Sequence, residues 1–351
     1  MDPSGLVCPL DAAGATDRSV AGGKGASLAE LQRAGLPVPP GFVITVRAFE
    51  RAMRVADPAH AIGATVAALS ATDPAAIERA TAAIRGQITS TPLAEDLAAA
   101  VTACYLSLGA DAPVAVRSSA VGEDAADASF AGLQDTYLWV RGVAAVLEKV
   151  RRCWASLYNT EAVSYRLRQH RPAHAAMAVV VQRMVDPRSA GVMFTCSPTT
   201  GDRSVVAIED SWGLGSVLVS GEVTPDSFVV SKVTGEIVRR TVAAKARLHR
   251  QAPDGSGTTS EDVAADLRER PCLDDEEVRS IARLGMVVER HYGTPQDIEW
   301  AVTGGEIVLL QSRAETVWTS RPAAPVATPK ARPMDHVFEH LGRPVFLKKG
   351  T

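Results

Sequence analysis

The chain has 351 residues, of which 46% are hydrophobic and 22% are charged, and its formal net charge is −3. This length allows two or three packed units of about 100–200 residues each, with the composition of an ordinary soluble globular protein. The small negative charge argues against nucleic acid and anionic membranes as partners. No apolar run reaches the ~18 residues of a membrane-spanning helix, and the N-terminus lacks a signal-peptide pattern. We therefore predict a cytoplasmic protein, and its five scattered cysteines, which lack metal-site spacing, are expected to be buried free thiols.

Residues 15–35, ATDRSVAGGKGASLAELQRAG, predict a turn that leads into an amphipathic helix. Glycines surround Lys24, and a lysine at a glycine-rich helix start can meet phosphate with both its ammonium and the helix dipole. This is not a Walker A loop, because Arg18 and Gly25 occupy positions where that pattern requires glycine and Ser/Thr. The alternative is a solvent-facing lysine at an ordinary helix N-terminus.

The stretch from Ala112 to Val140 carries the first candidate site. It predicts a short strand over Val114–Val116, an Arg-Ser-Ser turn, a loop of small residues up to Gly132, and a strand over Thr136–Val140. Arg117 offers a planar fork for phosphate oxygens, and the small residues of the loop let backbone N–H groups approach a ligand closely. The pattern suits a site for a polyphosphate.

Other elements follow from hydrophobic periodicity and turn residues. We expect, in chain order, a strand over 41–45 with Thr45 capping the next helix, packing helices over 57–108, two helices over 142–170, strands over 177–185 and 190–196, alternating strand and loop over 204–230, an exposed loop over 251–270, and a helix over 274–291.

Gln182 is a polar residue inside the apolar strand 177–185. Leaving such a group unpaired in a core costs roughly 1–3 kcal/mol, so a partner is required. Gln182 is either a core glutamine bonded to the backbone, or a contact to a purine or a metal at the sheet edge.

Residues 292–318 predict a β-hairpin whose two strands are joined around Gly304-Gly305. Asp297 and Glu299 share one face by period two, and a loop of residues 304–306 would set Glu299 opposite Gln311. Carboxylate and amide oxygens are hard ligands that suit Mg²⁺. The alternative is a surface ion-pair ladder between Asp297 and Arg313, which would contribute little stability.

Taken together, these motifs resemble the N-terminal ATP-binding domain shared by pyruvate phosphate dikinase, phosphoenolpyruvate synthase and rifampicin phosphotransferase. The resemblance spans about residues 18–317 and is carried by GGKGASLAEL…GLPVPPGFVIT, VAVRSSAVGEDAADASFAGLQDTYL, VVVQRMV…AGVMFT, GLG…VSGEVTPDSF and YGTPQDIEWAV…LLQSRAET. It implies an ATP-grasp fold of the α/β (α+β) class, with the nucleotide held between two lobes. The expected division is an N-terminal lobe over 1–186, a C-terminal lobe over 187–320, and a Pro/Ala-rich linker and tail over 321–351.

The resemblance also implies the roles of single residues and the cofactors ATP and Mg²⁺. The ATP site would be lined by Lys24, Arg117, Gly132, Thr136, Gln182, Glu299, Gln311 and Arg313. Lys24, Arg117 and Arg313 would hold the phosphates during catalysis, and Glu299 and Gln311 would bind Mg²⁺, with Asp297 a weaker candidate. The chain departs from the family pattern at Ser216, Leu133 and Ala314, where many relatives have Glu, Gln and Pro.

Family enzymes pass the phosphoryl group through a histidine on a separate domain, in a motif like GGxxSHAA. None of the seven histidines here has that context, and the sequence ends before any acceptor-binding domain. The chain therefore looks like the small subunit of phenylphosphate synthase. It would use ATP to diphosphorylate a histidine on a partner protein, giving AMP and phosphate, for transfer to a small hydroxyl compound or pyruvate. The alternatives are a stand-alone kinase acting directly on a small molecule, as in rifampicin phosphotransferase, and a non-catalytic nucleotide-binding module.

Overall fold

The computed structural model describes residues 5–121, 135–169, 176–255 and 257–318. Helices and strands are mixed along the chain, as expected, and the pairings between named strands in these ranges are antiparallel. The α+β form of the predicted class therefore applies. Gly132, Leu133 and the predicted tail over 321–351 lie outside the described residues.

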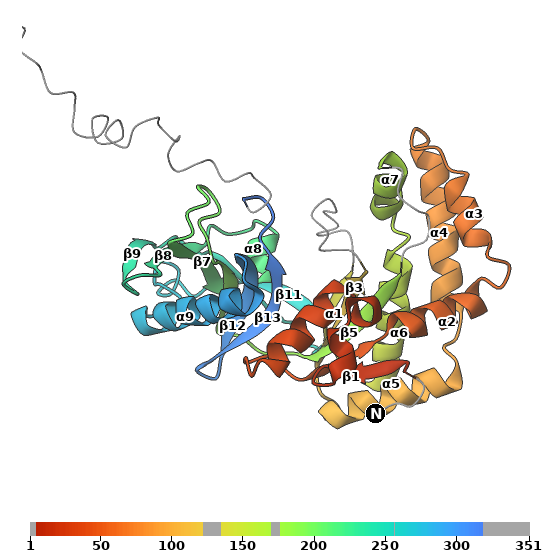
Figure 1. Ribbon diagram of the computed structural model, residues 1–351, viewed down its shortest axis with the longest axis horizontal. Helices are drawn as coiled ribbons and strands as arrows, with labels where there is room; N and C mark the ends of the chain where they lie inside the picture. Colours follow the sequence, from red (N-terminus) through yellow and green to blue (C-terminus); the bar gives the residue numbers. More distant parts are fainter. Residues whose placement is uncertain (1–4, 122–134, 170–175, 256, 319–351) are drawn as a thin grey trace, which may run out of the picture.

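Within the described residues, the first sheet has five strands in the order β1-β2-β5-β3-β4. Its strands are β1 (Val7–Pro9), β2 (Gly41–Ile44), β3 (Val114–Ala120), β4 (Thr136–Val140) and β5 (Met177–Arg183). The central strand β5 is apolar on both faces, since Val179 and Val181 belong to one core cluster while Ala178 and Val180 belong to another. Helices therefore cover this sheet on both sides (Figure 1).

The helices around the first sheet begin where the sequence supplies caps. Thr45 accepts a hydrogen bond from the Ala48 N–H, as predicted, and Asp73 accepts one from Ala76. The elements are η1 (Ala13–Thr16), α1 (Arg18–Arg33), α2 (Val46–Ala56), α3 (Ala61–Ala67), α4 (Pro74–Ser90), α5 (Glu95–Leu108), α6 (Val143–Ser156) and α7 (Thr160–Arg168).

The second sheet has the strand order β13-β12-β6-β7-β8-β9. Its strands are β6 (Ser189–Phe194), β7 (Val205–Trp212), β8 (Asp226–Ser231), β9 (Ile237–Thr241), β12 (Gln296–Thr303) and β13 (Glu306–Ala314). Helix α9 (Asp275–Tyr292) begins at a capping box formed by Asp274 and Glu277 and packs its buried face on this sheet. The short helix α8 (Ser216–Val219) follows β7.

Two predicted non-strand segments contain strands in the structure, and α8 lies within the range 204–230 that was predicted as strand and loop. Strand β3 continues through Arg117, Ser118 and Ser119, so the Arg-Ser-Ser segment is extended strand paired with β5 and not a turn. Residues 251–270 do not form a simple loop, because β10 (Arg247–Gln251) pairs with β11 (Thr258–Asp262). Both errors have one cause. The residues of these strands are mostly polar, so the sequence shows no apolar pattern of a strand, and only the backbone hydrogen bonds to a neighbouring strand define them.

Helix α1 joins the two sheets (Figure 1). Its residue Leu31 lies in the core of the second sheet, and the Ser27 hydroxyl donates a 2.7 Å hydrogen bond to the Ser312 carbonyl on β13. Just beyond the helix, the Leu309 N–H donates to the Pro37 carbonyl at 2.7 Å. These contacts fix the position of the first sheet relative to the β12–β13 hairpin. The predicted division between residues 186 and 187 falls between β5 and β6 and stays a prediction.

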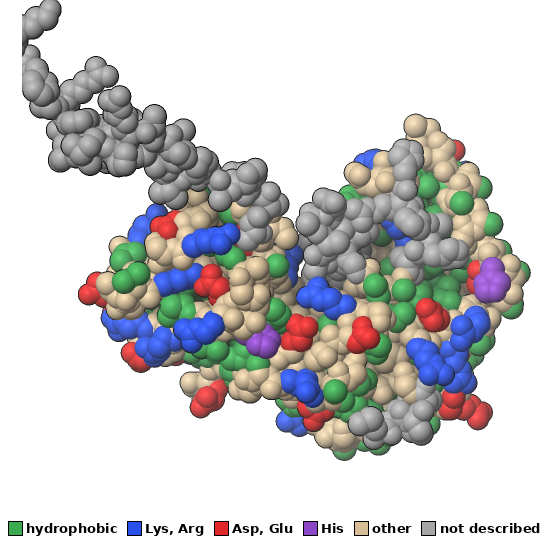
Figure 2. All heavy atoms as spheres, in the orientation of Figure 1, with side chains coloured by type: hydrophobic (Ala, Val, Ile, Leu, Met, Phe, Trp, Pro, Cys, Tyr) green, Lys and Arg blue, Asp and Glu red, His purple; other side chains and the backbone are tan. Residues whose placement is uncertain are grey.

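The five cysteines all lie in the described ranges, and none of them is in a disulfide. Cys153, Cys196 and Cys272 are buried, as expected, whereas Cys8 and Cys104 are half-buried. Across the same ranges, we find no helix with the length and apolarity needed to cross a bilayer. Side chains of both charge signs are interspersed on the face shown in Figure 2.

Candidate functional site

The β12–β13 hairpin pairs Glu299 with Gln311 and Asp297 with Arg313. The first of these pairings was predicted with a three-residue loop, but the turn has only two residues, Gly304-Gly305, both with positive φ. A register shift beside Glu299 makes up the difference, because Leu310 is left without a partner in the ladder. The correct pairing therefore arises from a tight turn plus a β-bulge.

The bulge receives Arg117 from the first sheet. Nη1 of Arg117 donates to the Leu310 carbonyl at 2.7 Å, and Nη2 donates to Gln311 Oε1 at 2.7 Å and Glu299 Oε2 at 3.2 Å. The Arg117 side chain is only 12% exposed, whereas Glu299 is 42% exposed. We call this cluster of Arg117, Glu299, Gln311 and the Leu310 carbonyl the Arg117 junction. It is a guanidinium held between hard oxygen atoms where the two sheets meet.

Asp297 and Arg313 form a separate ion pair beside the junction. Arg313 Nε and Nη2 lie 2.8 and 2.7 Å from Asp297 Oδ2, in a forked arrangement. Burial raises the pKa of Asp297, while the guanidinium of Arg313 opposes this shift. The ion-pair alternative from the sequence therefore describes Asp297 and Arg313 correctly, but not Glu299 and Gln311, which contact Arg117.

Lys24 lies just after a break in helix α1. Gly22 has φ 68° inside the helix, and a Cβ there would lie 2.1 Å from the Ser119 carbonyl oxygen. Ser119 Oγ donates to the Ala21 carbonyl at 2.7 Å and accepts from the Gly25 N–H at 3.0 Å, so it ties both sides of the break to β3. Lys24 itself is half-buried. The glycines of this motif thus permit close packing of α1 on the strand that carries Arg117.

A cavity of about 290 Å³ lies between the two sheets next to the Arg117 junction. Four of the predicted ATP-site residues line it: Arg117, Thr136, Gln182 and Glu299. Gln182 is 2% exposed, and its Nε2 donates to the Pro39 carbonyl at 3.2 Å. It is thus bonded to the backbone on a central strand, and the suggestion that it lies at the sheet edge is wrong.

The remaining walls of the cavity are mostly apolar side chains. They include Leu138, Met184, Val185, Val192, Leu214, Leu218, Trp300 and Leu310. None of these residues was predicted as a site residue, because an apolar side chain in a sequence is most simply explained by packing in the core. An apolar slot with a polar group at one side suits a flat, partly polar ligand.

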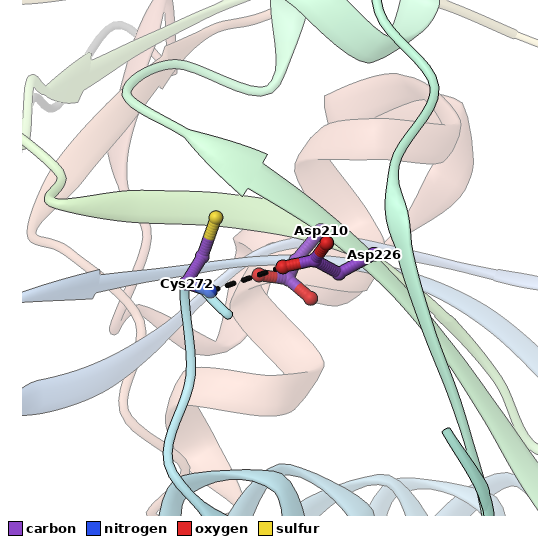
Figure 3. Close-up of side chains that lie close together, drawn as sticks. All are labelled: Asp210, Asp226 and Cys272. Carbon is purple, nitrogen blue, oxygen red and sulfur yellow. Dashed lines mark hydrogen bonds between the residues drawn. The ribbon is translucent and has the colours of Figure 1, made fainter. Parts of the chain in front are cut away.

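A second cluster, also missed from the sequence, joins two strands of the second sheet, β7 and β8, to the loop before α9 (Figure 3). Ligand atoms of Asp210, Asp226 and Cys272 lie within 4.8 Å of one another, and all three residues are buried. The ammonium of Lys245 is fully buried and contacts Asp226 Oδ1 at 2.5 Å. Asp226 also accepts from the Cys272 N–H at 3.0 Å. The Lys245 ammonium thus already supplies the positive charge that a metal ion would bring to this cluster. We therefore assign the cluster a structural role.

The protonation of Asp210 follows from this setting. Its Oδ2 accepts from the Ser189 hydroxyl at 3.2 Å, while Oδ1 is buried with no hydrogen-bond partner. Burial, with the nearby Asp226 carboxylate, raises the pKa of Asp210 to about 7. Burial and the same two carboxylates also raise the pKa of the Cys272 thiol, which argues against a thiolate ligand.

Comparison with known proteins places the chain in a family. Residues 18–333 match the family described as pyruvate phosphate dikinase, AMP/ATP-binding domain, and the chain belongs to it. The resemblance to this ATP-binding domain is therefore confirmed, and it supports ATP as the nucleotide.

Curated relatives agree with this assignment. The chain is 43% identical over 310 residues to a probable phosphoenolpyruvate synthase of Methanothermobacter thermautotrophicus, covering 86% of this chain and 45% of the relative. It is 44% identical over 316 residues to a rifampicin phosphotransferase of a Streptomyces species, covering 89% and 36%. A phosphoenolpyruvate synthase of Aeropyrum pernix is 40% identical over 346 residues, with coverage of 88% and 42%. The chain thus spans less than half the length of each of these relatives.

Proposed function

We propose that the chain binds Mg²⁺-ATP between two lobes of an ATP-grasp fold and passes its phosphoryl groups to a histidine on a partner protein. The observation that carries the nucleotide site is the Arg117 junction beside an apolar cavity of about 290 Å³. The base would occupy the apolar slot, and the phosphates would extend to the junction. In this arrangement the apolar walls contact the apolar base, and the polar groups of the junction contact the charged phosphates.

The oxygens of Glu299 and Gln311 fit a divalent cation. Both accept hydrogen bonds from the single atom Nη2 of Arg117, so they already converge on one positively charged group. A carboxylate and an amide oxygen are ligands that Mg²⁺ accepts together with phosphate oxygens. Asp297 is a weaker ligand candidate because Arg313 holds it. When bound, Mg²⁺ would neutralise charge on the phosphates.

The residues of the chain would act by position and charge. Arg117 would exchange its contacts with Glu299 and Gln311 for phosphate oxygens, which match the fork of its guanidinium. Lys24 and Arg313 would supply further positive charge, and phosphoryl transfer depends mainly on positioning and charge neutralisation. Gln182 and Thr136, which line the cavity, would contact the nucleoside.

The reaction proposed for the partner histidine proceeds in balanced steps. The histidine nitrogen attacks the β-phosphorus of ATP, and the bond to the α-phosphate oxygen breaks to release AMP. Water then removes one phosphate, and the remaining phosphoryl group passes to a small hydroxyl compound or pyruvate. Relatives named phosphoenolpyruvate synthase support this class of chemistry.

A stand-alone kinase is the second candidate. A larger cleft of about 940 Å³ adjoins the cavity, and Thr136, Leu138 and Ser216 line both spaces. Such a cleft could admit a small acceptor directly, as the rifampicin phosphotransferase relative suggests. Products separate the candidates: AMP and phosphate, formed only with a histidine-bearing partner, support the first. Stoichiometric ADP formed by the purified chain with a hydroxyl acceptor supports the second.

Calorimetric titration of the purified chain with Mg²⁺-ATP tests the nucleotide site. Charge-assisted hydrogen bonds contribute about 1.5–3 kcal/mol, so Arg117→Met should weaken ATP binding about ten- to a hundredfold. Arg51→Met is the matched control, because Arg51 pairs with Asp96 at the surface, away from the cavity. Equal ATP affinity in both variants would contradict the assignment of Arg117.

A further inference from the structure

Ser216 lies where the cavity between the sheets adjoins the larger cleft. It is the first residue of α8, it is half-buried, and it lines both spaces. Its hydroxyl is 2.8 Å from Nδ1 of His249, which lies on β10. From the sequence, Ser216 is a departure from the family pattern, and no role is predicted for His249.

His249 is held at both of its ring nitrogens. Nε2 lies 3.2 Å from Glu222 Oε1, and Glu222 Oε2 accepts from the Ser260 hydroxyl at 3.4 Å. The imidazole is only 13% exposed. Ser216, His249 and Glu222 therefore form a continuous hydrogen-bonded chain that starts at the wall of the cavity.

The backbone fixes the same arrangement. The Leu214 N–H donates to the His249 carbonyl at 2.8 Å. Gly213 has φ 74°, and a Cβ on it would lie 2.4 Å from that carbonyl oxygen. A glycine is thus required for β10 to approach the loop before α8. Because the backbone seats β10 against this loop, the position of the imidazole beside Ser216 does not depend on side-chain contacts alone.

The direction of the hydrogen bonds follows from their chemistry. Hydrogen bonds from Ser220 and His249 lower the pKa of Glu222, so this carboxylate is ionised and can only accept. Nε2 of His249 therefore carries the proton, and in the neutral imidazole Nδ1 is an acceptor. While the imidazole is neutral, the Ser216 hydroxyl donates its one proton to Nδ1. Only lone pairs of Ser216 Oγ remain for a ligand in the cavity.

We propose that Ser216 accepts a hydrogen bond from a ribose hydroxyl of the bound nucleotide, and that His249 is the positioning residue that orients it. The inference rests on the proposed function. The apolar walls suit the base and the Arg117 junction suits the phosphates, so the ribose between them belongs at the polar rim, where Ser216 and Thr136 lie. The ribose hydroxyl has a proton to donate, which matches the acceptor that Ser216 presents.

The test compares ATP with its 2′-deoxy, 3′-deoxy and corresponding fluoro analogues by calorimetry on the full chain. One hydrogen bond between neutral groups contributes about 0.5–1.5 kcal/mol, so one deoxy analogue should bind about three- to tenfold more weakly than ATP. The fluoro analogue at that position has no proton to donate and should bind as weakly. Ser216→Ala should lose the preference for ATP, whereas Ser107→Ala, at an exposed helical serine, should keep it.

Variants of His249 test its positioning role. His249→Asn keeps a polar atom near Nδ1 and should retain part of the preference for ATP, while His249→Leu should lose it. In the Ser216→Ala background, His249→Leu should cause no further loss. ATP binding with an unchanged preference in Ser216→Ala would overturn this inference alone. Failure of the wild-type chain to bind ATP would overturn the proposed function, and this inference with it.

Discussion

Replacing Asp210 with asparagine should change how the stability of the protein depends on pH. Asp210 is fully buried, its Oδ1 has no hydrogen-bond partner, and its pKa is raised to about 7, chiefly by burial and then by Asp226. A group whose pKa is higher in the folded state than in the unfolded state favours folding while it is protonated. That contribution is complete below the unfolded pKa and is lost as the pH rises through the folded pKa.

The size of the effect follows from the two pKa values. With an unfolded value of about 3.9 and a folded value of about 7, linkage predicts that the wild type loses about 2–3 kcal/mol of stability between pH 5 and pH 8 through this group. The asparagine amide cannot ionise, so the variant escapes this loss. Asp210→Asn should therefore gain stability relative to the wild type as the pH rises, by about the same amount.

Urea denaturation at pH 5, 6, 7 and 8 measures this difference. The control is Asp266→Asn, at an exposed aspartate, which should follow the wild-type pH profile. A difference between Asp210→Asn and the wild type that stays constant from pH 5 to pH 8 would refute the reasoning. A stability gain that is largest at pH 5 would show that the sign is wrong.

Two further substitutions test the packing of the chain. Gly22→Ala should destabilise by more than about 2 kcal/mol in a thermal melt, because its Cβ would lie 2.1 Å from the Ser119 carbonyl oxygen and its φ is 68°. Gly86→Ala, in α4 with open space around it, should instead stabilise by up to about 1 kcal/mol; similar melts for the two would contradict this account. Lys245→Met should cost about 3–5 kcal/mol in urea denaturation, because it leaves the buried Asp226 carboxylate without its cation. A loss under about 1 kcal/mol would show that the ammonium is not needed.

The order of elements could be predicted from the sequence where apolar periodicity or caps were present. Thr45, for instance, caps α2, and the apolar run 177–185 contains β5. The sequence did not predict the polar strands β10 and β11 or the second half of β3. These strands are defined by hydrogen bonds to other parts of the chain, and the residues next to them in the sequence do not indicate such a partner. The pairing of Glu299 with Gln311 was found, but the bulge at Leu310 that produces it was not.

The candidate site likewise has features that the sequence predicts and features that depend on tertiary packing. The sequence by itself determined the residue types that can meet a triphosphate and a metal, since strand alternation fixes which side chains share a face. Only the tertiary structure decided their partners, because Arg117 and Glu299 are 182 residues apart and meet only where the two sheets are joined. The same holds for Ser216 and His249 at the rim of the cavity and for Lys245 in the core. Such contacts depend on how separately formed elements pack, and no local pattern in the chain encodes that packing.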